Sequence, residues 1–181
     1  PEMRMLRAFS VLALGACALL AGDWSKPVDV LHELQPCVTY KAKLDGDLLV
    51  VQATIQPGWH TFAIDNEKRA AEKLAGKPSL GIDMPTQIKA VKGLEIVGPW
   101  YQTAPKDFSK PDIRWYSWGF EQQAVFAAKV RATGAGSGEI GIRGQACSDS
   151  TCKNIDVAVA VPLDKAGKPS GVTLKSLVAT R

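Results

Sequence analysis

Residues 138–163 restrict the fold more than any other part of the chain, because their apolar side chains recur at every second position. The runs "EIGIRGQAC" and "NIDVAVAVPL" therefore predict two strands that each have one buried face. Four residues, "SDST" at 148–151, connect them, which is a usual length for a hairpin loop. The pattern predicts an antiparallel hairpin in which Cys147 and Cys152 face each other at the strand ends.

Other short β-rich runs recur between glycines and prolines, and the clearest two flank "DGD" at 45–47, which is a hairpin signal. Residues 65–75, "DNEKRAAEKLA", predict one helix with a charged outer surface, which Asp65 or Asn66 can cap. Short strands at regular spacing with one small helix indicate an all-β fold, an immunoglobulin-like β-sandwich with one short surface helix. The strands expected outside the 138–163 hairpin span 38–45, 48–55, 87–91, 94–97 and 123–132.

Residues 1–22 have the features of an export signal. Arg4 and Arg7 precede an apolar stretch that is too short for a comfortable membrane-spanning helix. Two cleavage patterns overlap at Cys17: "ACA" is a small-x-small site, whereas "LGAC" resembles a lipoprotein lipobox. The first would discard this cysteine, and the second would tether it to a membrane through a lipid.

We expect one exported domain over residues 23–163, followed by a tail over 164–181 that ends in a short element. The formal net charge is +4 and the lysines are scattered, so the sequence carries no nucleic-acid footprint. The pattern GxGxxG at 136–141 leads into a strand, whereas a dinucleotide-binding fingerprint opens a helix. We therefore expect no cofactor, and membrane attachment only if Cys17 is lipidated.

Three cysteines follow the signal, and the pair Cys147 and Cys152 allows three interpretations. As a structural staple, so short a ring contributes only about 2 kcal/mol in the chain-entropy model. If the two cysteines are a redox pair, their spacing places a resolving cysteine close to the nucleophile, and the hairpin tip gives a partner access. A metal site has less support, because zinc prefers four ligands and His32 and His60 are isolated. If the pair forms a disulfide, Cys37 is a buried free thiol or an intermolecular partner.

Residues 101–120 are dense in aromatic side chains and contain two prolines, which predicts an ordered loop. The loop either packs at the core and rim of the sandwich or forms a cap or partner surface. Charged side chains flank the cysteine pair: Arg143 and Lys153 would favour a thiolate, and Asp149 would oppose it. The aromatic residues of the loop are Tyr101, Phe108, Trp115, Tyr116, Trp118 and Phe120.

Three stretches carry a resemblance to a known family: "PGWHTF" at 57–62, "FEQQAVFAAKV" at 120–130 and the whole cysteine-containing block at 138–163. Together they resemble the N-terminal periplasmic domain of the DsbD thiol:disulfide interchange proteins, over roughly residues 38–163. The cysteine block is the specific part. The resemblance implies an immunoglobulin-like fold whose cysteine pair shuttles electrons in the bacterial periplasm.

The resemblance also implies roles and partners for a thiol:disulfide oxidoreductase of this kind. A thioredoxin-like donor reduces the pair, which then reduces oxidised periplasmic proteins such as disulfide isomerases. Cys152 would be the nucleophile that forms the mixed disulfide, and Cys147 its resolving partner. An aromatic cap loop covers the pair in this family, and the candidates here are Phe108, Trp115 and Tyr116.

The chain departs from the family in several respects. Well-known members have one more residue between the cysteines than the four found here. They also continue into a membrane domain and a thioredoxin domain, so we expect the donor to be a separate protein. The helix over 65–75 and Cys37 are not expected family features. The alternative hypothesis is a non-catalytic exported binding or assembly module whose cysteine pair only pins a hairpin.

Overall fold

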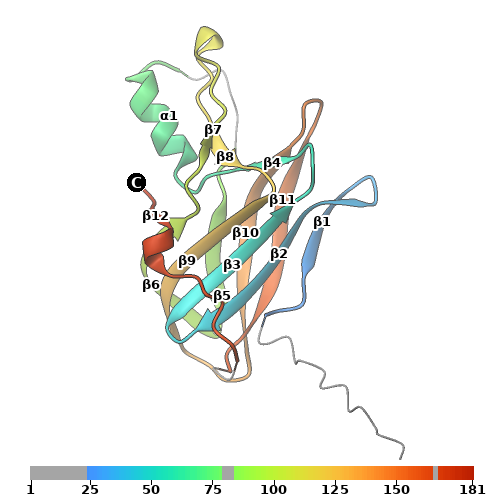
Figure 1. Cartoon of the computed structure of the whole chain (residues 1–181), viewed down its shortest axis with the longest axis vertical. Coiled ribbons are helices and arrows are strands. Elements are labelled where there is room, and N and C mark those ends of the chain that lie inside the picture. Colours follow the sequence, from blue (N-terminus) through green and yellow to red (C-terminus); the bar gives the residue numbers. More distant parts are fainter. Residues whose placement is uncertain (1–23, 79–83, 165–166) are drawn as a thin grey trace, which may run out of the picture.

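The computed structural model describes residues 24–78, 84–164 and 167–181, and these fold into two β-sheets packed face to face (Figure 1). Among the described residues, sheet A has the strand order β1-β2-β3-β9-β6-β12. Sheet B has the order β11-β10-β4-β8-β7, and β5 also pairs with β10. The predicted all-β, immunoglobulin-like sandwich with one short helix is confirmed. The predicted export signal and Cys17 lie outside the described residues.

The elements have the following bounds. Sheet A contains β1 (Val28–His32), β2 (Gln35–Asp45), β3 (Leu48–Ile55), β9 (Gln123–Ala132), β6 (Leu94–Gln102) and β12 (Val178–Ala179). Sheet B contains β11 (Cys152–Pro162), β10 (Ser137–Cys147), β4 (His60–Phe62), β8 (Trp118–Phe120), β7 (Lys106–Asp107) and β5 (Gln87–Lys92). The helices are α1 (Asn66–Leu74), η1 (Pro111–Ile113) and η2 (Leu174–Ser176).

The hairpin that the alternating pattern predicts is β10–β11. Its two strands pair continuously from Ser137 opposite Pro162 to Cys147 opposite Cys152. Ile140, on the inner face, is completely buried against sheet A. Burying such a side chain contributes about 1.5–3 kcal/mol, so the alternation fixes the register of the whole hairpin. The hairpin β2–β3 is confirmed in the same way.

The hairpin β1–β2 was not predicted, and β2 begins at Gln35 rather than at residue 38. The reason lies in the turn between the strands, where Glu33 and Leu34 have φ angles of 49° and 65°. Glycine, asparagine or aspartate usually occupy such left-handed turn positions, so the sequence shows no turn signal here. Strand β6 also runs to Gln102, beyond the predicted end at 97.

Helix α1 lies within the predicted range, but the predicted side-chain cap does not form. Asp65 occupies the N-cap position and its side chain makes no capping hydrogen bond. Its carboxylate instead accepts hydrogen bonds from Arg69 Nε at 2.8 Å and Gln102 Nε2 at 2.6 Å. Asn66 turns its Oδ1 towards β8 and accepts the Trp118 N–H at 2.7 Å. Hydrogen bonds between buried polar groups thus connect the helix to both sheets.

The described part of the tail lies along sheet A. Ser170 donates its backbone N–H to Asp45 at 2.8 Å, and Asp45 forms an ion pair with the buried Lys43, Nζ to Oδ1, at 3.1 Å. Strand β12 then pairs with β6, so the short final element expected in the tail is a strand. Arg181 donates its backbone N–H to Asp65 at 3.0 Å. The domain boundary at residue 163 stays a prediction.

Candidate disulfide site

Cys147 and Cys152 form a disulfide across the last register pair of β10–β11, with their Cα atoms 4.0 Å apart. A tight turn closes the hairpin beyond them. Ser148 donates its N–H to the Thr151 carbonyl at 2.8 Å, and its hydroxyl oxygen accepts from the Thr151 N–H at 3.3 Å. Backbone pairing and turn hydrogen bonds therefore already hold the strand ends together, so the disulfide adds little to the geometry.

The two cysteines differ sharply in exposure. Cys147 is only 5% exposed, whereas Cys152 is exposed to solvent. The sheet order explains part of this difference, because β10 is flanked by β11 and β4 while β11 is the edge strand. One sulfur-bearing residue is accessible to another protein and the other is covered.

The position of β10 inside the sheet does not by itself bury Cys147, because this side chain points away from the core. Its neighbour Ala146 is completely buried on the inner face, and successive side chains alternate between the faces of a strand. The neighbouring strand at this position of sheet B is β4. His60 in β4 is the register partner of Cys147, and its ring centroid lies 5.1 Å from that of Phe108 and 5.3 Å from that of Phe62.

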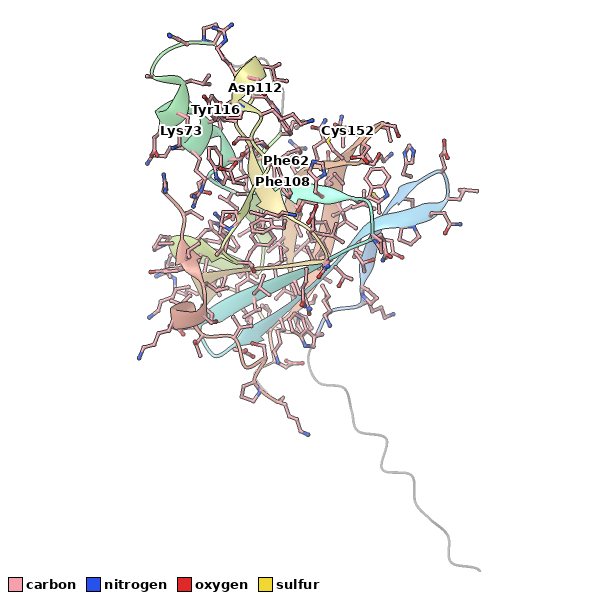
Figure 2. All side chains as sticks on the ribbon, turned by 45° about the horizontal axis from the view of Figure 1, so that its top comes forward. Phe62, Lys73, Phe108, Asp112, Tyr116 and Cys152 are labelled. Carbon is pink, nitrogen blue, oxygen red and sulfur yellow. A yellow bond between two sulfur atoms is a disulfide. The ribbon has the colours of Figure 1, made fainter. Side chains whose placement is uncertain are left out.

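Phe108 reaches this position on a projecting arm, residues 103–117, within the segment 101–120 that the sequence predicts as an ordered loop. That prediction is wrong where β6 extends to Gln102 and where β7 and β8 form. The arm is a hairpin with β7 on one side, η1 near its tip and β8 after it. Phe108 donates its N–H to the Ser117 carbonyl at 2.9 Å, which closes the hairpin at that level. Figure 2 shows Phe108 and Phe62 together at the base of the arm, with Cys152 beyond them and Asp112 near the tip.

Gly119 permits this close packing. A Cβ at this position would lie 1.9 Å from the Thr61 carbonyl oxygen and 3.2 Å from a ring carbon of Phe108. Any other residue would push β8 away from β4 or lift the ring of Phe108. The sequence analysis did not select Gly119, although its place between Trp118 and Phe120 is a signal of close backbone approach.

The other two cap candidates lie elsewhere on the arm. Trp115 packs under Lys110, whose Nζ is 5.3 Å from the ring centroid, and the two residues form a β-bridge. Tyr116 is half-buried and packs against the core cluster. Of the three candidates, Phe108 is the one in ring contact with the cross-strand neighbour of Cys147.

The flanking charges are not arranged as the sequence suggests. Arg143 forms an exposed ion pair with Asp156, Nε to Oδ1, at 3.3 Å, so its charge is largely neutralised. Lys153 alternates with Cys152 and points to the other face of β11.

Burial raises the pKa of the Cys37 thiol, and the charge of Lys153 opposes this effect. Cys37 is a buried free thiol whose Sγ donates to the Val30 carbonyl at 3.2 Å.

Two sequence predictions concern other kinds of site. Within the described residues, no group of three or more histidine, cysteine or acidic side chains is arranged to hold a metal ion. Across the same part of the chain, no helix has the length and apolar character needed to cross a bilayer. His60 lies next to the disulfide as the register partner of Cys147, which its isolation in the sequence did not indicate. Its alternation with Thr61 in "WHTF" was the available signal, since it places His60 on the outer face.

Comparison with known proteins gives matches among solved structures. No family model and no curated protein sequence matches the chain. Among solved structures, it is similar to the N-terminal periplasmic domain of ScsB from Proteus mirabilis, with a TM-score of 0.51 and 13% identity. The predicted fold is confirmed. The match covers 78% of this chain but 51% of the ScsB chain, so this chain spans about half the length of that relative.

Two weaker matches have TM-scores below 0.5. One is the DsbD N-terminal domain of Neisseria meningitidis in its reduced form, at 10% identity, 70% coverage of this chain, 85% of that chain and a TM-score of 0.40. The other is the GAE domain of GGA2p from Saccharomyces cerevisiae, at 6% identity, 76% and 98% coverage and a TM-score of 0.36. The resemblance to a DsbD-like N-terminal domain thus holds at the level of the fold.

Proposed function

We propose that this chain is a periplasmic thiol:disulfide exchange module whose redox centre is the pair Cys147 and Cys152. The observation that carries the proposal is the difference between the two cysteines. Cys152 is exposed on an edge strand, whereas Cys147 is 5% exposed beside β4. A structural disulfide needs no accessible sulfur, but an exchange pair needs one that a partner can attack and one that is protected from stray thiols.

The arrangement assigns a role to each cysteine. A thiolate of a thioredoxin-like donor attacks the Cys152 sulfur, the bond to Cys147 breaks, and its electron pair remains on the Cys147 sulfur. A second donor thiolate then attacks the donor sulfur of the mixed disulfide, which releases the Cys152 thiolate and leaves the donor oxidised. The reduced pair passes these two electrons to an oxidised periplasmic protein by the reverse steps, in which Cys152 is the nucleophile and Cys147 resolves the mixed disulfide.

Phe108 is proposed as the cap of this pair. Its ring lies on His60, and that contact extends the cover of the arm to the strand position next to Cys147. The arm is anchored to sheet B, because β7 pairs with β8 and β8 pairs with β4. The ScsB relative is described as a periplasmic domain, which supports the same location for this chain.

The first test is the reduction potential of the pair in a Cys37→Ser background, measured by equilibration with glutathione or dithiothreitol buffers. Exchange proteins have values between about −120 and −270 mV, which is the expected result. A value below about −300 mV is typical of a structural bridge. That result would favour the non-catalytic binding or assembly module.

Trapping of mixed disulfides tests the two roles separately. The Cys147→Ser variant should accumulate a mixed disulfide with an oxidised periplasmic protein through Cys152, because the thiol that resolves this intermediate is missing. The Cys152→Ser variant should neither trap such a protein nor turn over with a thioredoxin-like donor, and Cys37→Ser is the matched control. Unchanged turnover of Cys152→Ser would remove the proposal.

A further inference from the structure

We propose that His60 is a positioning residue for the exchange reaction: it orders the cover over Cys147 and stabilises the thiolate that forms there when the disulfide opens. This inference rests on the proposed function of the pair. Its role is distinct from that of the cap, because an imidazole can carry a charge and Phe108 cannot.

The position of His60 is fixed by two independent sets of contacts. Within sheet B it lies directly opposite Cys147, and cross-strand partners of this kind have Cβ atoms about 4.5–5.5 Å apart on the same face. Its ring also packs against Phe62 and Phe108, with centroid separations of 5.3 Å and 5.1 Å. Two aromatic neighbours restrict the imidazole, so it cannot swing freely into solvent.

The other charged groups at this end are placed less favourably. Lys106 and Glu121 neutralise each other through an exposed ion pair, Nζ to Oε2, at 2.8 Å. Asp107 points to the opposite side of the arm, where it lines a cleft with Arg69 and Lys73. The titratable and charged side chains on the elements packed around β4 at this end are Lys106, Asp107, Glu121, His32, Asp149 and Lys153.

The chemical step is the opening of the disulfide. A thiolate of the attacking thiol forms a bond to the Cys152 sulfur, and the electron pair of the broken bond moves to the Cys147 sulfur. An imidazolium at His60 stabilises this new thiolate and can transfer a proton to it, which leaves a neutral imidazole and a thiol. When Cys147 later resolves a mixed disulfide, the proton returns to the imidazole and the thiolate attacks.

The test compares oxidised His60→Phe with the parent domain, both in a Cys37→Ser background. Phenylalanine keeps a ring on Phe62 and Phe108 but removes the charge. The rate of reduction by glutathione is measured from pH 5.5 to 8.5, and the ratio of the two rates cancels the titration of glutathione itself. We expect the variant to be about tenfold slower at pH 6, and the ratio to approach one at pH 8.5, where histidine is neutral.

His32→Phe is the matched control, because His32 packs on Trp59 with a centroid separation of 5.3 Å and is not opposite a cysteine. Its rate ratio should stay near one at every pH. A ratio for His60→Phe that is the same at all pH values would mean that His60 only fills space, and would overturn the inference. Since glutathione is the reductant, this result does not depend on whether a protein donor exists.

A second measurement covers the case in which His60→Phe disturbs folding. The chain has two histidines, so His60 gives the remaining imidazole signal in the His32→Phe variant by nuclear magnetic resonance. Its titration midpoint should be higher in the reduced than in the oxidised protein, because a neighbouring thiolate favours imidazolium. Equal midpoints in the two forms would contradict the inference even if the reduction potential supports exchange.

Discussion

The surroundings of the disulfide and those of the Asp65 carboxylate differ in exposure and in hydrogen bonding. At the disulfide end, Cys152 is open to solvent whereas its partner Cys147 is 5% exposed. Asp65 is 4% exposed and accepts hydrogen bonds from Arg69, Gln102 and the Arg181 backbone. In the first region one of the two cysteines is accessible to a partner. The Asp65 carboxylate is not accessible, because every direction is occupied, and it holds α1, β6 and the tail together instead.

The pKa of Asp65 reflects this difference. Burial alone raises the pKa of the carboxyl group, but the hydrogen bonds from Arg69, Arg181 and Gln102 outweigh burial and hold the pKa below its usual value. The charged form is therefore the stable one in the folded protein. This is the behaviour of a structural anion rather than of an acid or base that must exchange protons near neutral pH.

The largest expected effect on stability comes from Asp65→Ala. The substitution leaves Arg69 and Gln102 without their buried acceptor, and breaking such a pair costs about 3–5 kcal/mol. Denaturant unfolding measures the loss, and the reduction potential of the disulfide should not move. Glu72→Ala is the control, since its ion pair with Arg181 is half-exposed and contributes less than about 1 kcal/mol. A shifted potential would show that the two regions are coupled.

Removal of the disulfide should cost less stability than removal of the carboxylate. The double variant Cys147→Ser, Cys152→Ser loses about 2 kcal/mol or less, because the ring is short and β10–β11 is already paired along its whole length. The free energy of unfolding measured by urea titration tests this value. A loss as large as that of Asp65→Ala would contradict the contrast and would favour a structural disulfide.

Phe108→Ala should affect reactivity more than stability. Phe108 is half-buried, so the substitution should cost about 1–2 kcal/mol, less than for a fully buried phenylalanine. Alkylation of reduced Cys147 by iodoacetamide should become several-fold faster, because the ring no longer holds His60 and the arm in place. Trp115→Ala is the matched control on the same arm. Equal rates for both variants and the parent would remove Phe108 as the cap.

The smallest effect is on the pH dependence of stability. The pKa of Asp45, like that of Asp65, is lowered because hydrogen bonds from Ser170 and Lys43 outweigh the effect of burial. A carboxyl group with a lowered pKa in the folded state stabilises above its unfolded pKa of about 4, and this stabilisation is lost as the pH falls below it. The free energy of unfolding should therefore decrease more steeply below pH 4 in the parent than in Asp65→Asn. Parallel curves would refute this account.

The sequence predicted the parts whose signals are local. Regular alternation identified β10–β11 and β2–β3 because one buried face determines the register of a strand. Helix formers between a polar cap and a glycine identified α1. The same reasoning missed β1 because Glu33 and Leu34 form a left-handed turn without the usual residues. It offered Asp65 or Asn66 as the helix cap, and Asp65 occupies that position. It did not reveal the side-chain bonds of Asp65, because Gln102 and Arg181 are far away in sequence.

The sequence by itself determined that two cysteines meet at the end of a hairpin, because strand periodicity and loop length are short-range properties. Only the tertiary structure decided that they are unequal. Next to Cys147 the chain returns twice to the same region, first as β4 with His60 and then as the arm, whose Phe108 ring contacts His60. Such contacts depend on sheet order and on the space that Gly119 leaves between β4 and β8. Neither is encoded in the spacing of the cysteines.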